Sequence, residues 1–260
     1  MNNLSMYIAR ESGLHNLHPL TKSLLVLCLL AAGLALPGRW TSYIIFIIFI
    51  VPLAVWGKIF RELIRAVWKI TWPLALSVLI IQSLFWGKGT PIFEFWRIAP
   101  KEEGVLFAFI SIGRIILTMS DFMLFAMATR PDTLMISLKQ VGMPSGLAYI
   151  VVTTLQIIPS FQRKVSTILD AQRSRGLETQ GNLLVRSRAL VPIVLPLVLG
   201  SLMDVEERAI AIQARAFGAK RVETSIIEIS DTDEQKLLRR ILMILILTII
   251  LFRILWQLFT

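Results

Sequence analysis

The stretch "VLFAFISIGRIILTMSDFMLFAMA", residues 105–128, contains only two charged side chains, Arg114 and Asp121. A helix needs about 20 consecutive, mostly apolar residues to cross the hydrocarbon core of a bilayer. This stretch is therefore long enough and apolar enough to span a membrane. It predicts a fold built around the lipid bilayer.

The composition of the whole chain agrees with that prediction. Of its 260 residues, 55% are hydrophobic and 17% are charged, and the mean hydropathy is +0.71, which is high for a soluble domain. The first twenty residues lack the pattern of a cleavable signal peptide, so we expect the first apolar segment to remain as an anchor. Cys28 is the single cysteine, which excludes an intramolecular disulfide.

Four further apolar stretches predict additional spans, at residues 20–36, 41–56, 70–86 and 237–259. The predicted fold class is therefore an all-α integral membrane protein with about five transmembrane helices. We expect four of them in residues 1–128 and the last in residues 237–260. The intervening residues 129–236 form a separate module.

Charge predicts the orientation. Between residues 56 and 70 the basic residues Lys58, Arg61, Arg65 and Lys69 outnumber the one acid, Glu62, whereas residues 87–104 are balanced. The positive-inside rule then places the first loop, the N-terminus and residues 129–236 in the cytoplasm. The pI near 10.3 reflects this topology, and without aromatic residues between the basic ones we expect no nucleic-acid partner.

Residues 129–236 contain two apolar runs, 146–161 and 189–203, that could be read as a sixth and a seventh span. That reading would place six basic residues outside the cell against the charge rule: Arg163, Lys164, Arg173, Arg175, Arg186 and Arg188. The apolar residues also recur every three and four positions, as in amphipathic helices. We therefore predict a cytoplasmic module of long amphipathic helices.

The helix boundaries follow from prolines, caps and glycines. We expect a short helix over residues 131–140 with Gly142 as its stop, and a long helix that is capped by Ser145, runs to Arg175 and stops at Gly176. A second long helix is expected from its cap at Asn182 to near Phe217. Prolines 159, 192 and 196 fall inside the long helices and predict kinks.

Both long helices are predicted to end in arginine, in "DAQRSRGLETQG" (170–181) and "AIQARAFGAKR" (211–221). An arginine in the last turn often only complements the helix dipole at the surface. Two helices that end alike instead favour a partner with two equivalent halves. Planar guanidinium groups suit clefts lined by carboxylates or backbone carbonyls.

Four segments carry a resemblance to a known family. They are "AQRSRG" (171–176), "ARAFG" (214–218), "SGLHNLHPLTKSLL" (12–25) and "TRPDTLMISLKQVGMP" (129–144). The first two are similar to the paired Ala-Arg-Gly signatures of the transmembrane (T) subunit of energy-coupling factor (ECF) transporters, a family that includes the cobalt-transport subunit CbiQ. The third is similar to that family's N-terminal Leu-His-x-Leu-x-Pro-x-Thr-Lys stretch.

This resemblance implies a non-catalytic transporter subunit in a prokaryotic cell membrane. Its crossed coupling helices would grip two cytoplasmic ABC ATPase subunits and a separate substrate-binding (S) membrane subunit that imports a vitamin or a transition-metal ion. ATP and Mg²⁺ would be bound by the ATPases, so no cofactor is expected on this chain.

The family signature transfers with two departures. Arg175 and Gly176 match the first signature, with Ser174 in place of alanine, and Ala214 and Arg215 match the second, with Ala216 in the glycine position. The resemblance thus implies these ATPase-coupling residues: Arg173, Arg175, Gly176, Ala214, Arg215, Ala216, Phe217 and Gly218.

Other polar residues give weaker signals. Arg114 and Asp121 lie seven residues apart, and such intramembrane charges should face protein, water or a partner. His15 and His18 have no accompanying ligand cluster, so we expect no metal site. No catalytic motif is found. The alternative function, a stand-alone channel or a membrane-embedded enzyme, predicts polar residues on several spans.

Overall fold

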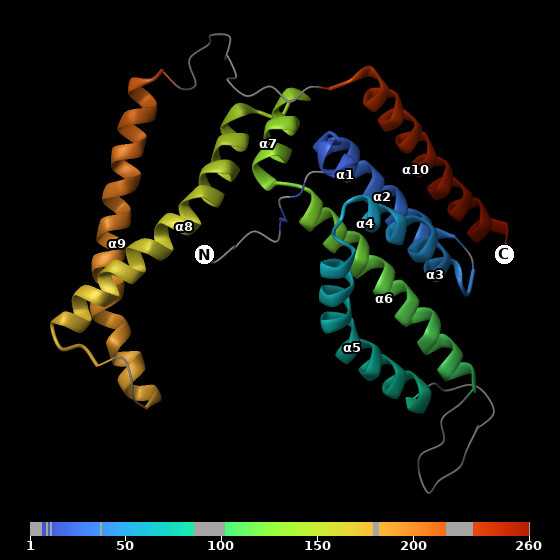
Figure 1. Cartoon of the computed structure of the whole chain (residues 1–260), viewed down its shortest axis with the longest axis horizontal. Helices are drawn as coiled ribbons and strands as arrows, with labels where there is room; N and C mark the ends of the chain where they lie inside the picture. Colours follow the sequence, from blue (N-terminus) through green and yellow to red (C-terminus); the bar gives the residue numbers. More distant parts are fainter. Residues whose placement is uncertain are drawn as a thin grey trace, which may run out of the picture. The chain divides into compact units, whose positions relative to one another are not determined.

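The computed structural model describes residues 7–8, 10, 12–36, 38–85, 102–178, 182–216 and 231–259. Within these residues the secondary structure is helical and contains no strand. The chain divides into two compact units: Met1–Ser137 with Ile229–Thr260, and Leu138–Glu228 (Figure 1).

The first unit holds the most apolar helices. These are α1 (Gly13–Asn16), α2 (Pro19–Ala35), α3 (Thr41–Ile45), η1 (Phe46–Ile50), α4 (Val51–Trp56), α5 (Phe60–Phe85), α6 (Glu102–Ala128) and α10 (Asp233–Phe259). In the described part of the chain, α5, α6 and α10 are long and apolar enough to cross a membrane, while α2 and the segment Thr41–Trp56 are shorter apolar helices. The predicted all-α membrane fold is confirmed.

Helix α5 begins earlier than the hydropathy predicts, at Phe60 rather than at residue 70. Arg61, Arg65 and Lys69 recur every four residues and are exposed, whereas Leu63 and Val67 between them are buried. The first turns are therefore an amphipathic helix that continues into the apolar span. The sequence reading treated these turns as a loop because it followed charge alone.

The segment Thr41–Trp56 is not a uniform α-helix. Over η1 it widens to a π-helix, in which the Val51 N–H donates to the carbonyl of Phe46. Pro52 has no N–H to donate to the carbonyl of Ile48. The wide turn thus lies directly before the residue that cannot continue the ordinary hydrogen-bond ladder.

The helices of the first unit pack in pairs, with α5 against α6, α6 against α2, and α2 against α10 (Figure 1). Small residues allow close approach: a Cβ on Gly33 would lie 1.9 Å from Leu117 Cδ2, and one on Gly113 would lie 2.4 Å from Tyr43 Cε2. Buried core side chains include Leu29, Ile45, Ile50, Leu63, Leu117 and Leu124.

The second unit contains two long helices, α8 (Ser145–Ser174) and α9 (Leu183–Ala214), while α7 (Pro131–Gln140) crosses the boundary between the units. Helix α7 has the predicted bounds and is followed by Gly142 at φ 109°. Helix α8 begins at Ser145 itself with Pro144 as its N-cap, so Ser145 is not the cap. Asn182 is the N-cap of α9 as predicted, but α9 ends at Ala214 with Arg215 as its C-cap, so the predicted end near Phe217 is wrong.

Candidate functional site

The two long helices of the second unit contact each other at Lys164. Its ammonium group reaches from α8 to α9, donating to the carbonyl of Gly200 at 2.8 Å and to Asp204 Oδ2 at 2.7 Å. A Cβ on residue 200 would lie 3.2 Å from Lys164 Nζ, so glycine leaves room for this contact. Figure 1 shows that α8 and α9 cross.

A second contact satisfies a carbonyl that the sequence leaves without its usual donor. The carbonyl of Pro192 should accept from the N–H of residue 196, but Pro196 has none. Gln172 on α8 instead donates to it through Nε2 at 3.3 Å. Pro192 of α9 is thus bonded to the last turns of α8.

The end of α8 is a Schellman motif. The N–H of Gly176 donates to the carbonyl of Arg173 at 2.9 Å, and that of Leu177 to the carbonyl of Gln172 at 3.0 Å. Arg175 is the C-cap residue, with φ −89° and ψ 7°, and Gly176 follows in the left-handed region at φ 88°.

The end of α9 repeats this geometry without a glycine. Arg215 is the C-cap residue, with φ −85° and ψ 10°, and Ala216 follows at φ 54°. The Ala216 N–H donates to the carbonyl of Gln213 at 2.9 Å, the equivalent of the Gly176 bond. Alanine in this conformation costs about 1 kcal/mol relative to glycine. Ala216 thus replaces the signature glycine but keeps a left-handed backbone conformation.

These two segments, residues 175–176 and 215–216, are termed the arginine tips below. Both arginines are exposed, and neither forms an ion pair with any residue that the structure describes. Ser174 lies ten residues beyond Lys164, and Ala214 lies fourteen beyond Gly200, which corresponds to about 15 and 21 Å of helix. In Figure 1 the tips lie at opposite ends of the crossed pair.

The other predicted coupling residues are placed as follows. Arg173 lies in the last turn of α8, with Nη1 3.6 Å from Asp170 Oδ1. Ala214 is the last residue of α9 and is exposed. Phe217 and Gly218 lie outside the described residues. Their role and that of the other coupling residues stays a prediction.

The two charges of α6 have different environments. The Asp121 side chain is fully buried, and neither of its oxygens has a hydrogen-bond partner in the described ranges, whereas Arg114 is exposed. The structure does not join them in an ion pair among its described residues.

His15 is held by hydrogen bonds. Its Nδ1 lies 2.7 Å from Ser12 Oγ, and its Nε2 lies 3.0 Å from the carbonyl of Ile8. Lys22 donates to the carbonyls of His15 and Ala128, both at 2.9 Å. These bonds fasten the N-terminal segment to the end of α6.

Sequence reasoning did not identify Lys164, Gly200, Asp204 or the Gln172–Pro192 bond as features of the site. One signal was present: Gln172 is a polar residue in the predicted apolar stripe of its helix. A second signal was that Pro196 lies four residues after Pro192, so the carbonyl of Pro192 has no N–H donor within its own helix.

Comparisons with known proteins agree with this architecture. The family described as "Cobalt transport protein" (CbiQ) matches residues 10–226. The chain is similar to three proteins named "Energy-coupling factor transporter transmembrane protein EcfT". That of Thermanaerovibrio acidaminovorans is 31% identical over 82% of each chain. Those of Lactococcus lactis subsp. cremoris and Clostridium kluyveri are 26% and 25% identical over 99% and 97% of each chain.

The family match extends from before α1 to beyond the end of α9 and thus includes both arginine tips. The chain therefore belongs to the EcfT/CbiQ family, the non-catalytic, multi-pass transmembrane subunits of energy-coupling factor transporters.

Proposed function

We propose that this subunit transmits the movement of two ABC ATPases to a substrate-binding membrane subunit, and that each arginine tip binds one ATPase. The observation that carries this proposal is the repeated backbone geometry of the two tips. Two exposed guanidinium groups on helix ends of similar backbone geometry suit two equivalent clefts.

The crossed helices would act as the mechanical element. Lys164 ties them near the middle, and each tip lies about 15 to 21 Å of helix away from that contact. A displacement at one tip would pass along a rigid helix to the crossing and to its neighbour, as in shear motions of packed helices.

On this proposal the N-terminus and residues 129–236 are cytoplasmic, because the ATPases are. ATP and Mg²⁺ would be bound by the ATPases, with no cofactor on this chain. The transported solute, a vitamin or a transition-metal ion, would be bound by the S subunit.

The test is charge reversal at the tips in the full complex. Arg175→Glu/Arg215→Glu should abolish uptake and weaken ATPase binding, since losing one central interface arginine costs about 2 kcal/mol or more, or roughly 30-fold in Kd. The matched control is Arg163→Glu/Arg208→Glu, which makes the same charge change at exposed positions away from the tips. Unchanged uptake and ATPase co-purification in the tip variant would contradict the proposal.

A further inference from the structure

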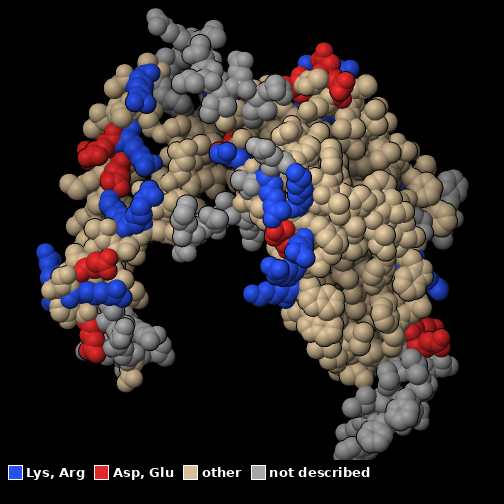
Figure 2. Space-filling model, viewed as in Figure 1, with Lys and Arg blue, Asp and Glu red and all other residues tan. Residues whose placement is uncertain are grey.

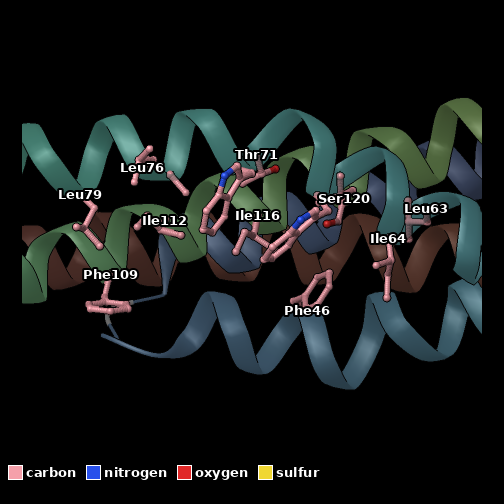
Figure 3. A pocket seen from close by; sticks show the side chains of 14 residues that line it. Phe46, Leu63, Ile64, Thr71, Leu76, Leu79, Phe109, Ile112, Ile116 and Ser120 are labelled. Atoms are coloured by element: carbon pink, nitrogen blue, oxygen red, sulfur yellow. The ribbon is translucent and has the colours of Figure 1, made fainter.

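A groove of about 460 Å³ lies in the first unit between α5, α6 and η1. Figure 3 shows Leu76 and Leu79 of α5, Phe109 and Ile116 of α6, and Phe46 of η1 turned toward this space. The polar groups among its lining side chains are the hydroxyls of Thr71 and Ser120 and the indole N–H groups of Trp68 and Trp72. Such a lining offers almost nothing to a hydrophilic ligand.

The groove is long and open to the surface of the unit. Its lining extends along α5 from Leu63 to Leu79, about 24 Å of helix. This length and the apolar lining suit an extended hydrocarbon chain.

Aromatic side chains line the middle of the groove, and basic side chains lie on α5 close to the end marked by Leu63. Trp68 and Trp72 line it, are 64% and 55% exposed, and stack with ring centroids 5.2 Å apart. Successive steps of four, three and four residues place Arg61, Arg65, Trp68 and Trp72 on one face of α5. Tryptophans prefer the membrane–water interface, so the arginines lie at the headgroup level.

The charge at this end is positive. Glu62, the acid nearest in sequence, is engaged by Arg10 at 2.5 Å. Arg61 and Arg65 are exposed and form no ion pair with the residues described here. Figure 2 shows Lys and Arg side chains gathered around the start of α5.

We propose that this groove binds one phospholipid with an anionic headgroup. One acyl chain lies along the groove between α5, α6 and η1 and passes the Trp68–Trp72 pair, and the headgroup is held by Arg61 and Arg65. The guanidinium groups favour the phosphate, and a headgroup with net negative charge gains more from the basic end than a zwitterionic one does.

Tryptophan fluorescence tests this assignment on the full-length chain. The protein is placed in phosphatidylcholine nanodiscs that contain a small fraction of acyl-brominated phosphatidylglycerol, or of equally brominated phosphatidylcholine. The part of the quenching that is lost in the Trp68→Phe/Trp72→Phe variant comes from these two tryptophans, and we call it local quenching. We expect strong local quenching by the anionic lipid and little by the zwitterionic one.

Two pairs of variants separate the headgroup from the chain. Arg61→Gln/Arg65→Gln should lower the preference for phosphatidylglycerol about fivefold per arginine, whereas Arg163→Gln/Arg208→Gln, with equal loss of charge in the other unit, should not. Arg65→Lys should keep most of the preference because it retains the charge. Ala75→Phe fills the groove and should abolish local quenching, whereas Ser77→Phe, on another face of α5, should not.

Other results would overturn the proposal. Equal quenching by both lipids would show that the basic end does not select an anionic headgroup. Quenching that survives Ala75→Phe would place the lipid elsewhere. If Ala75→Phe left lipid quenching unchanged but prevented co-purification of a membrane partner, the groove would be a protein interface instead.

Discussion

The end of each coupling helix contains a left-handed residue, and exchanging glycine and alanine at the two positions should have opposite effects. Gly176 has φ 88° and Ala216 has φ 54°. A Cβ added at Gly176 would meet nothing within 4 Å, so no steric clash contributes to the effect of Gly176→Ala. The cost is then the left-handed backbone alone, about 1 kcal/mol.

Ala216→Gly should relieve the same strain at the end of α9. The more flexible glycine in the unfolded chain offsets part of that gain, which leaves about 0.5 kcal/mol. The matched control is Gly146→Ala, since Gly146 lies in the first turn of α8 with open space around it and no positive φ. This control should stabilise its helix by about 0.5 to 1 kcal/mol.

Hydrogen exchange with mass spectrometry on the full-length protein in detergent measures these changes. A cost of 1 kcal/mol corresponds to about fivefold faster exchange of the Gly176 and Leu177 amides, which bond to the carbonyls of Arg173 and Gln172. Ala216→Gly should slow exchange at the end of α9 about twofold. If Gly176→Ala slowed exchange, or Ala216→Gly accelerated it, the assigned helix-end geometry would be wrong.

Three further predictions concern packing and protonation. Lys164→Met should destabilise the helix crossing by about 1 kcal/mol. Asp204→Asn should destabilise it by less, because Lys164 keeps its hydrogen bond to the Gly200 carbonyl. Thermal unfolding of the two variants measures both effects. Gly113→Ala should lower the melting temperature, since its Cβ would displace the Tyr43 ring and break the 2.7 Å bond from its hydroxyl to the Phe109 carbonyl. Burial, with the nearby charge of Lys22, lowers the pKa of His15 below its ordinary 6.5. Below pH 6.5 the unfolded chain therefore binds more protons at His15 than the folded chain does. The stability that neutral His15 contributes is present above pH 6.5 and is lost as the pH falls below it. His15→Gln should remove this pH dependence of the free energy of unfolding.

Much of the fold could be predicted because the bilayer and the backbone impose simple rules. Length and hydropathy placed the apolar helices, and proline in the first turn with Gly142 beyond the last gave the bounds of α7. The start of α5 was missed because basic residues on one face do not end a helix. The π-helical turn before Pro52 depends on local hydrogen bonding that apolar periodicity does not encode.

The candidate site was only partly predictable. The positions of Arg175 and Arg215 at helix ends could be read from the sequence, since a glycine lies near each. The left-handed Ala216 could not, because alanine normally avoids that region and Gly218 is the better sequence candidate. The Lys164 contacts depend on how α8 crosses α9, which no local pattern determines.

Cross-linking at the two tips shows whether each of them contacts an ATPase subunit. In a Cys28→Ala background, Ser174→Cys and Ala214→Cys place one thiol beside each arginine while leaving both arginines intact. The assembled transporter is then treated with a short reagent that joins thiols to amines. The account predicts that each position cross-links to an ATPase subunit and that the double variant captures two ATPases on one chain. Absence of any ATPase adduct at either position, in a complex that still contains both ATPases, would contradict it.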